Sequence, residues 1–179
     1  MKFEELNIQD LYIIKPEIIS DERGFFRRNF CKKIFEEKNI DFNIKQNNIS
    51  ENINYGTLRG FHYQFQPSLE KKIITVLSGS IYNVTIDLRK NSSTFMNKVY
   101  LELNADQRTS VIIPNLCANA FITTSENTII LYHMNDYYNQ ELYSGFRYDD
   151  PYFSIKWPFK PNFISKKDSN YPNFYLEML

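Results

Sequence analysis

The chain is poor in histidine, cysteine and glycine, and it has no excess of charge of either sign. Its 179 residues include 2 histidines, 2 cysteines and 5 glycines, and 21 basic side chains balance 21 acidic ones. A net charge of zero excludes a global field that would attract nucleic acid or an anionic membrane. Any bound anion must therefore be held by a local cluster of cations.

Long apolar runs are missing as well. No stretch of the sequence is long and apolar enough to span a bilayer, and the acidic start, residues 1–5, lacks the apolar core of a signal peptide. The two cysteines, Cys31 and Cys117, are interpreted as free thiols in a reducing compartment. The sequence thus predicts a cytoplasmic protein with neither a membrane nor a nucleic-acid partner.

What the chain does have is short strand-like segments rich in tyrosine and phenylalanine. Aromatic residues make up 16% of the chain, and these residue types favour strands. A turn separates segments roughly every 8–12 residues, which is typical of a sandwich or barrel. The turn at Gly79 predicts a hairpin between the first two segments of this series. The expected strands of this part are 72–77, 81–88, 98–104, 109–114, 120–124 and 128–134.

Shorter segments come before this series. Residues 11–19 form an apolar run that Pro16 interrupts, which indicates an edge or bulged strand. Residues 31–38 have the composition of a helix, and they are the only helix that we expect. After residue 151 the chain is rich in proline and aromatics without periodicity, so it is expected to wrap the barrel. The expected strands of this part are 25–30 and 42–50, the first preceded by a turn at 21–24.

The stretch of residues 56–64 holds one of the two histidines. On a regular strand Arg59 and His62 would face opposite sides, unless Gly60 bends or bulges the chain. The simplest alternative is a core histidine beside a surface arginine. A neutral imidazole can take a proton next to a carbonyl group, a tyrosine can return one, and an ammonium can stabilise the enolate. Such a set suits proton abstraction next to a carbonyl group, and that chemistry requires no cofactor.

The other histidine is not expected to bind a metal. His133 follows Tyr132 in an alternating strand, so one side chain faces out when the other faces in. Metal-dependent barrels of the cupin kind draw several histidines from two motifs, and Asn119 stands where the second motif would place one. A metal-dependent oxygenase, which would contain bound iron or another transition metal, is therefore a minor alternative.

Residues 58–64 resemble the active-site strand of the cofactor-independent nucleotide-sugar 3,5-epimerases, the family typified by dTDP-4-dehydrorhamnose 3,5-epimerase. The resemblance covers nearly the whole chain, from residues 19–26 to residues 164–168. It implies an all-β, cupin-like jelly-roll barrel in one domain, residues 1–179, with a short helix near 31–38 and an irregular C-terminal segment. It also implies a homodimer in which residues 20–30 cross to the partner.

The resemblance further implies a role for each of several side chains. His62 is similar to the general base of the family, Asp168 to the carboxylate that orients it, and Tyr132 to the general acid. Lys72 resembles the lysine near the keto oxygen, and Arg59 resembles a diphosphate ligand. Without the resemblance, Asp168 could be a cap, Lys72 a solvated neighbour of Lys71, and Tyr132 a core aromatic. Further positions that match substrate-binding residues are Arg23, Phe26, Gln46, Asn48, Tyr138 and Lys167.

Three positions depart from the family pattern. Asn119 replaces a histidine and can still donate a hydrogen bond to a phosphate, and Asn83 replaces an aspartate. Arg28 stands where the rhamnose enzymes have a glutamate that meets thymine, and an arginine can only donate. Guanine offers two adjacent acceptors to a guanidinium, so the departure favours guanosine, with cytosine second. Arg28 could instead supply phosphate charge or face solvent beside Arg27.

The sequence therefore predicts an isomerase that acts on a nucleotide-diphosphate 4-keto-6-deoxy sugar in surface-polysaccharide biosynthesis. It would invert C3, C5 or both, and neither the nucleotide base nor the choice of hexose or heptose follows from the sequence. A catalytically silent protein that binds nucleotide sugars on the same fold is the alternative, and Asn83 and Asn119 are the residues that favour it.

Overall fold

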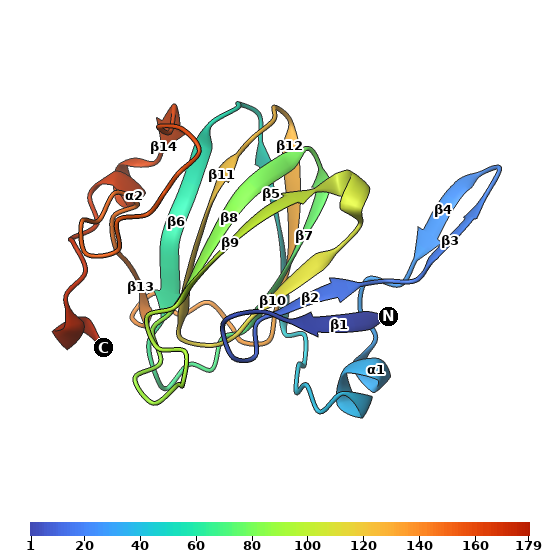
Figure 1. The fold of residues 1–179 in the computed structure, drawn as a ribbon, viewed down its shortest axis with the longest axis horizontal. Coiled ribbons are helices and arrows are strands. Elements are labelled where there is room, and N and C mark those ends of the chain that lie inside the picture. The colour runs from blue at the N-terminus through green and yellow to red at the C-terminus, as the bar shows by residue number, and fades with distance from the viewer.

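A computed structural model describes residues 1–179, and the chain folds into two facing β-sheets (Figure 1). The first sheet has the order β1 (Lys2–Glu5), β2 (Tyr12–Lys15), β10 (Ser110–Ile113), β7 (Lys72–Ser78), β12 (Thr128–Met134) and β5 (Gln46–Asn52). The second has the order β13 (Tyr143–Gly145), β6 (Thr57–Gln64), β11 (Cys117–Thr123), β8 (Ser80–Asp87) and β9 (Lys98–Asn104), and β14 (Phe163–Ile164) pairs with β6. The predicted all-β class is confirmed.

The remaining elements lie at the margins of the two sheets. Strands β3 (Ile18–Asp21) and β4 (Gly24–Arg27) form a hairpin that projects away from the body of the molecule (Figure 1). Helix α1 (Lys32–Glu37) confirms the predicted helix, and α2 (Lys166–Ser169) is a single turn near the C-terminus. Two 3₁₀ turns span Ala105–Gln107 and Leu176–Met178. No helix in the chain has the length and apolar character that a bilayer crossing requires.

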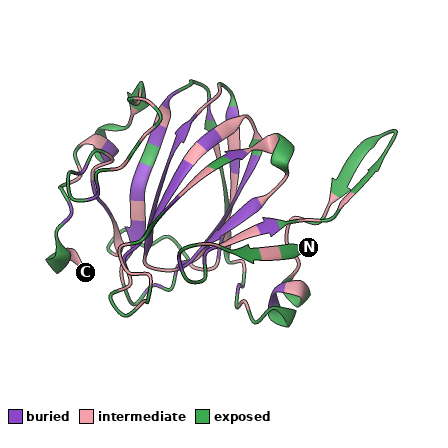
Figure 2. Cartoon of the chain, in the orientation of Figure 1, coloured by how far each residue is buried: buried purple, intermediate pink, exposed green.

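Two of the three apolar clusters of the chain lie on the two faces of the second sheet. One fills the space between the sheets, where Ile74 and Ile130 of the first sheet meet Ile81 and Phe121 of the second. The other covers the outer face of the second sheet, because Phe61, Phe146, Phe153 and Phe174 pack together there. The C-terminal segment therefore wraps the barrel as predicted. Figure 2 shows buried residues concentrated in the two sheets, and exposed ones along the β3–β4 hairpin.

The hairpin predicted at Gly79 is wrong. Strand β7 pairs with β10 and β12, whereas β8 pairs with β11 and β9, so the turn carries the chain from one sheet to the other. Gly79 has a φ of +75°, which a tight reversal needs whether or not the two strands then hydrogen-bond. The apolar run at 11–19 is likewise divided between two sheets, because Pro16 separates β2 in the first sheet from β3 in the projecting hairpin.

Candidate active site

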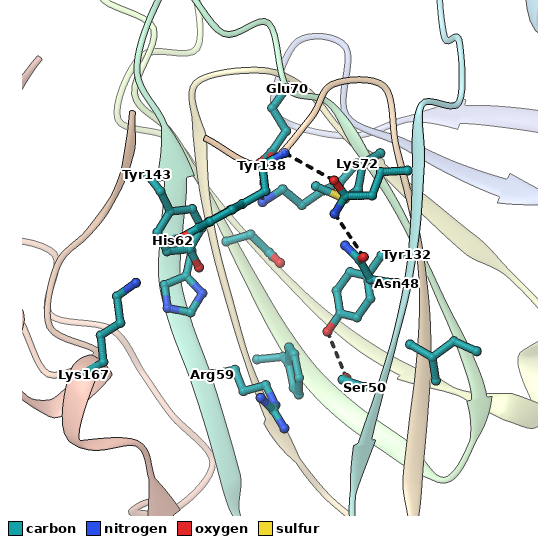
Figure 3. A pocket seen from close by; sticks show the side chains of 15 residues that line it. Asn48, Ser50, Arg59, His62, Glu70, Lys72, Tyr132, Tyr138, Tyr143 and Lys167 are labelled. Atoms are coloured by element: carbon teal, nitrogen blue, oxygen red, sulfur yellow. Dashed lines mark hydrogen bonds and ion pairs between the residues drawn. The ribbon is translucent and has the colours of Figure 1, made fainter. Parts of the chain in front are cut away.

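A cavity of about 410 Å³ lies between the two sheets, where β5 and β12 of the first sheet face β6 and β11 of the second (Figure 3). Polar side chains line most of it, and they come from both sheets and from the C-terminal segment. The first sheet contributes Gln46, Asn48, Ile49, Ser50, Lys72, Tyr132 and Met134; the second contributes Arg59, His62, Asn119, Phe121 and Tyr143; the remainder are Glu70, Tyr138 and Lys167.

Arg59 and His62 both line this cavity although they are three positions apart on one strand. The pairing of β6 with β11 explains this, because Arg59 lies opposite Phe121 and His62 opposite Asn119, so β6 has one residue more than its partner here. Gly60 has a φ of +114°, in the region that glycine alone adopts readily. The bulge that the sequence required for a shared cavity is present.

We expect Gly60→Ala to lower the free energy of unfolding by roughly 2–5 kcal/mol, the sum of backbone strain and overpacking. A Cβ atom at this position would lie 2.5 Å from the carbonyl oxygen of Asn119 and 2.6 Å from Cα of Ala120. Gly24→Ala is the matched control, because Gly24 has a similar φ of +123° and no atom within 4 Å of the added Cβ. Urea denaturation measures both, and equal losses in the two variants would contradict the role of close packing at Gly60.

His62 is held by a buried carboxylate. Its Nε2 lies 2.8 Å from Oδ1 of Asp168, and the other carboxylate oxygen accepts a hydrogen bond from the backbone N–H of Gly60. Burial opposes the charge of Asp168, but the hydrogen bond and charge of His62 outweigh it and hold the pKa of the carboxyl below its usual range. The ring of Tyr143 lies 5.2 Å from the imidazole.

The contact with Asp168 also fixes the tautomer of the neutral imidazole. A carboxylate only accepts, so Nε2 carries the hydrogen and Nδ1 is left with a lone pair that can take a proton. Asp168 itself follows Ser165, whose hydroxyl accepts from the Asp168 N–H and begins the single turn of α2. The alternative interpretation of Asp168 as a cap therefore does not hold, because Ser165 has that role.

Tyr132 lies across the cavity from His62 (Figure 3). Its hydroxyl is 3.2 Å from the hydroxyl of Ser50 on the neighbouring strand β5. Burial raises the pKa of the Tyr132 phenol, although the hydrogen bond with Ser50 and the charge of Arg59 act in the other direction. The phenol consequently keeps its proton at neutral pH and can deliver it into the cavity.

Lys72 is buried and forms an ion pair with Glu70 at 3.0 Å. Glu70 also accepts a hydrogen bond from Nε2 of Gln64, a neighbour of His62 on β6. Lys71 points elsewhere, since its ammonium donates to the carbonyl oxygen of Asp41. Lys72 is thus a cavity residue with a fixed ammonium group, and it is not the solvated partner of Lys71.

Two cations of the cavity have no carboxylate partner. Nε of Arg59 donates to the side-chain oxygen of Asn52 at 2.8 Å, and Nζ of Lys167 lies 4.5 Å from the ring centroid of Tyr143. Gln46, Asn48 and Tyr138 line the wall beside Lys72: Gln46 donates to Asn48 and accepts from the Tyr138 N–H. The cavity therefore combines a base, three phenols and three cations, a set that suits an enolate intermediate and a diphosphate.

The family model described as dTDP-4-dehydrorhamnose 3,5-epimerase matches residues 5–175. The chain belongs to this family. Among its relatives, the dTDP-4-dehydrorhamnose 3,5-epimerase of Methanothermobacter thermautotrophicus is 34% identical, over 95% of this chain and 92% of the relative. The predictions of the family, of an isomerase and of a nucleotide-sugar epimerase are confirmed.

Solved structures of the epimerase family agree with this fold. The dTDP-4-dehydrorhamnose 3,5-epimerase of Bacillus anthracis, with TDP and PPi bound, has a TM-score of 0.93 at 34% identity and covers 97% of this chain and 99% of its own. The Legionella pneumophila enzyme, in complex with dTDP-4-keto-L-rhamnose, has a TM-score of 0.90 at 33% identity and covers 99% and 94%. The cupin-like jelly roll is thereby confirmed.

Three predicted substrate-binding residues lie outside the cavity of this epimerase chain. Arg23, Phe26 and Arg28 belong to the projecting β3–β4 hairpin or follow it directly. The guanidinium of Arg23 pairs with the carboxylate of Asp21 in the exposed turn. Phe26 and Arg28 instead line a separate hollow of about 100 Å³ near α1. Within one chain the structure brings none of the three to His62.

Asn119 does line the cavity, but its amide nitrogen points away from it. That nitrogen lies 2.8 Å from Oδ1 of Asn83, 3.0 Å from the carbonyl oxygen of Val84 and 3.3 Å from the hydroxyl of Thr85. Both amide hydrogens are therefore used inside the sheet, and none is left for a phosphate. The hydrogen bond that the sequence predicted for Asn119 is absent in this arrangement.

Sequence reasoning missed Ser50, Glu70 and Tyr143 as site residues. Ser50 could have been found, because it shares one face of β5 with Gln46 and Asn48 at a spacing of two. Glu70 gives no such signal, since it precedes β7 in a loop and only the fold brings it to Lys72.

No group of three or more His, Cys, Asp or Glu side chains is placed to hold a metal ion. His133 alternates with Tyr132 as predicted and lies on the other face of β12, where its ring is 6.1 Å from that of Phe30. One of its ring nitrogens lies 3.2 Å from the side-chain nitrogen of Asn29. His133 is therefore a packing residue outside the cavity.

Proposed function

We propose that this chain epimerises a dTDP-4-keto-6-deoxyhexose at C3 and C5 without a cofactor, in surface-polysaccharide biosynthesis. The observation that carries the proposal is that His62, held by Asp168, lies on one wall of the cavity and the phenol of Tyr132 lies on the opposite wall. A base and an acid on opposite walls can remove a proton from one face of a carbon and return one to the other face.

The keto group at C4 acidifies the hydrogens on both flanking carbons. Nδ1 of His62 takes one of these protons, and the electron pair of the broken C–H bond moves onto the keto oxygen to form an enolate. The ammonium of Lys72 stabilises the enolate oxygen, and Asp168 stabilises the imidazolium that forms. Tyr132 then donates its proton to the opposite face, which inverts the carbon and restores the ketone.

The diphosphate needs cations that are not already neutralised. Arg59 and Lys167 meet this requirement, because neither forms an ion pair within the chain and both line the cavity. Lys72 is less suited, since Glu70 already balances its charge. We therefore assign Arg59 and Lys167 to the diphosphate, and Gln46, Asn48 and Tyr138 to the substrate beside Lys72.

The homodimer is also a proposal. The β3–β4 hairpin exposes Ile19 by 60%, Phe25 by 51% and Phe26 by 64%, and a projecting apolar hairpin of this kind fits a second copy of the chain. Such a dimer would remove Arg23, Phe26 and Arg28 from solvent. Sedimentation equilibrium measures the oligomeric state directly. A cytoplasmic location agrees with free thiols at Cys31 and Cys117 and stays a prediction.

Incubation in heavy water tests the function. We expect the protein to incorporate deuterium at C3 and C5 of a dTDP-4-keto-6-deoxyhexose, because each cycle replaces a sugar proton with one from solvent. Mass spectrometry and proton NMR follow the exchange at each carbon. A protein that binds dTDP-sugars but exchanges no proton with any of them would be the silent binding protein that the sequence left as the alternative.

The nucleotide base is tested by calorimetric titration with dTDP, GDP and CDP. We expect dTDP to bind most tightly, because the Bacillus anthracis and Legionella relatives bind thymidine nucleotides and Arg28 lies outside the cavity of its own chain. The guanosine prediction rests on Arg28 alone. Tightest binding of GDP, lost in an Arg28→Ala variant, would restore it and contradict the thymidine proposal.

A further inference from the structure

The orientation of the Asn119 amide is fixed by its neighbours. Asn119 on β11 is the register partner of His62 on the adjacent strand β6. Its side-chain nitrogen is 3.0 Å from the carbonyl oxygen of Val84. A backbone carbonyl only accepts, so the side-chain atom that faces it must be the nitrogen and not the oxygen. The second hydrogen of the same nitrogen goes to Oδ1 of Asn83 at 2.8 Å.

The carbonyl end of Asn119 is consequently free. No donor of the chain bonds to Oδ1 of Asn119. The fully buried side-chain atoms that lack a hydrogen-bond partner belong to Arg27, Tyr63 and Tyr171, so Oδ1 of Asn119 is not fully buried. The oxygen is therefore not sealed within the barrel, and it opens into the cavity that Asn119 lines. The wall of the cavity that holds His62 therefore also presents, on the neighbouring strand β11, a neutral hydrogen-bond acceptor.

An acceptor at this point suits one part of the substrate. The free charged groups of the cavity, Arg59 and Lys167, are donors, and the carboxylate of Glu70 is already paired with Lys72. Phosphate oxygens accept and gain nothing from a second acceptor, whereas a sugar hydroxyl donates. Of the two carbons that flank the keto group, C3 carries a hydroxyl, while C5 carries a methyl group and the ring oxygen.

We propose that Oδ1 of Asn119 accepts a hydrogen bond from the C3 hydroxyl and selects sugars that carry it. The inference rests on the proposed function, because it needs the reacting carbons to lie beside His62. It also replaces the phosphate contact that the sequence suggested for Asn119. Asn83, Val84 and Thr85 then act as positioning groups, since they hold the amide with its oxygen toward the cavity.

The test compares a dTDP-4-keto-6-deoxyhexose with its 3-deoxy analogue, both of which exchange a proton at C5. In the wild type we expect kcat/KM for C5 exchange to be about tenfold lower for the 3-deoxy sugar, the effect of one lost hydrogen bond beside a polar group left unpaired. In Asn119→Leu we expect the two sugars to react at nearly equal rates. A tenfold preference that persists in the variant would overturn the proposal.

Binding of dTDP alone supplies the control. We expect Asn119→Leu to bind dTDP as tightly as the wild type in calorimetry, which also shows that the cavity has folded. If that variant does not fold, the double variant Asn83→Leu with Asn119→Leu removes both buried amides together and is measured in its place. A tenfold loss of dTDP affinity would make Asn119 a phosphate ligand and overturn the proposal. A wild type that exchanges neither sugar would refute the proposed function itself.

Discussion

Replacing His62 with asparagine is expected to lower proton exchange at C3 and C5 by at least about 10³-fold, within the range that a general base contributes. His62 is the one histidine of the cavity, and Nδ1 is its free basic nitrogen because Nε2 is bonded to Asp168. Asparagine keeps a polar group near Asp168 but has no comparable basicity. Deuterium incorporation into a dTDP-4-keto-6-deoxyhexose, followed by mass spectrometry, measures the effect.

His133→Asn is the matched control for this variant. It makes the same substitution at the other histidine, which lies on the opposite face of β12 against Phe30. We expect its exchange rate to stay within about twofold of the wild type, and we expect His62→Asn still to bind dTDP in calorimetry. Normal exchange in a folded His62→Asn variant would remove the imidazole from the mechanism.

The placement of the proposed catalytic residues could be predicted from the sequence because these residues lie in motifs whose spacing is characteristic. The structure brings His62, Tyr132 and Lys72 to one cavity and places Asp168 against His62, although the four residues lie on four different elements. The bulge at Gly60 was also open to prediction, since a cation and a base three positions apart can share a cavity only if the strand is irregular.

Other features depend on packing that a linear pattern does not record. A turn such as that at Gly79 has the same sequence signal whether its strands pair or separate into two sheets, so the expected hairpin was wrong. The orientation of Asn119 follows from the carbonyl oxygen of Val84 on a neighbouring strand, which no motif around Asn119 contains. Glu70 reaches Lys72 only through a loop whose path the sequence leaves open.

The strand pairing also explains why the predicted substrate-binding residues divide into two groups. Gln46 and Asn48 are two residues apart on β5, so both side chains lie on the same face of the strand and line the cavity. In the sequence Phe26 also matches a family position, whereas Arg28 stands where the rhamnose enzymes have a glutamate. Both residues lie beyond the two sheets, where a single chain offers them no cavity to line except the hollow near α1.

Replacing Tyr132 with phenylalanine is expected to separate exchange from inversion. The variant keeps the ring and its packing but removes the hydroxyl that lies 3.2 Å from Ser50. His62 can still remove a proton and return a solvent-derived one to the same face, so deuterium incorporation should continue. Inversion needs a proton from the opposite wall, and we expect its rate to fall by about 10²–10⁴-fold, the usual contribution of a general acid. Proton NMR of the sugar ring distinguishes retained from inverted centres.

Tyr138→Phe decides between Tyr132 and Tyr138, two of the three tyrosines that line the cavity. Tyr138 is 51% exposed and lies on the Lys72 side, whereas burial raises the pKa of the Tyr132 phenol and keeps its proton in place for delivery. We therefore expect Tyr138→Phe to change KM for the sugar while the ratio of the inversion rate to the deuterium-exchange rate changes less. If Tyr132→Phe inverts both centres normally while Tyr138→Phe does not, the acid is Tyr138. The proton would then come from the Lys72 end of the cavity and not from the wall opposite His62.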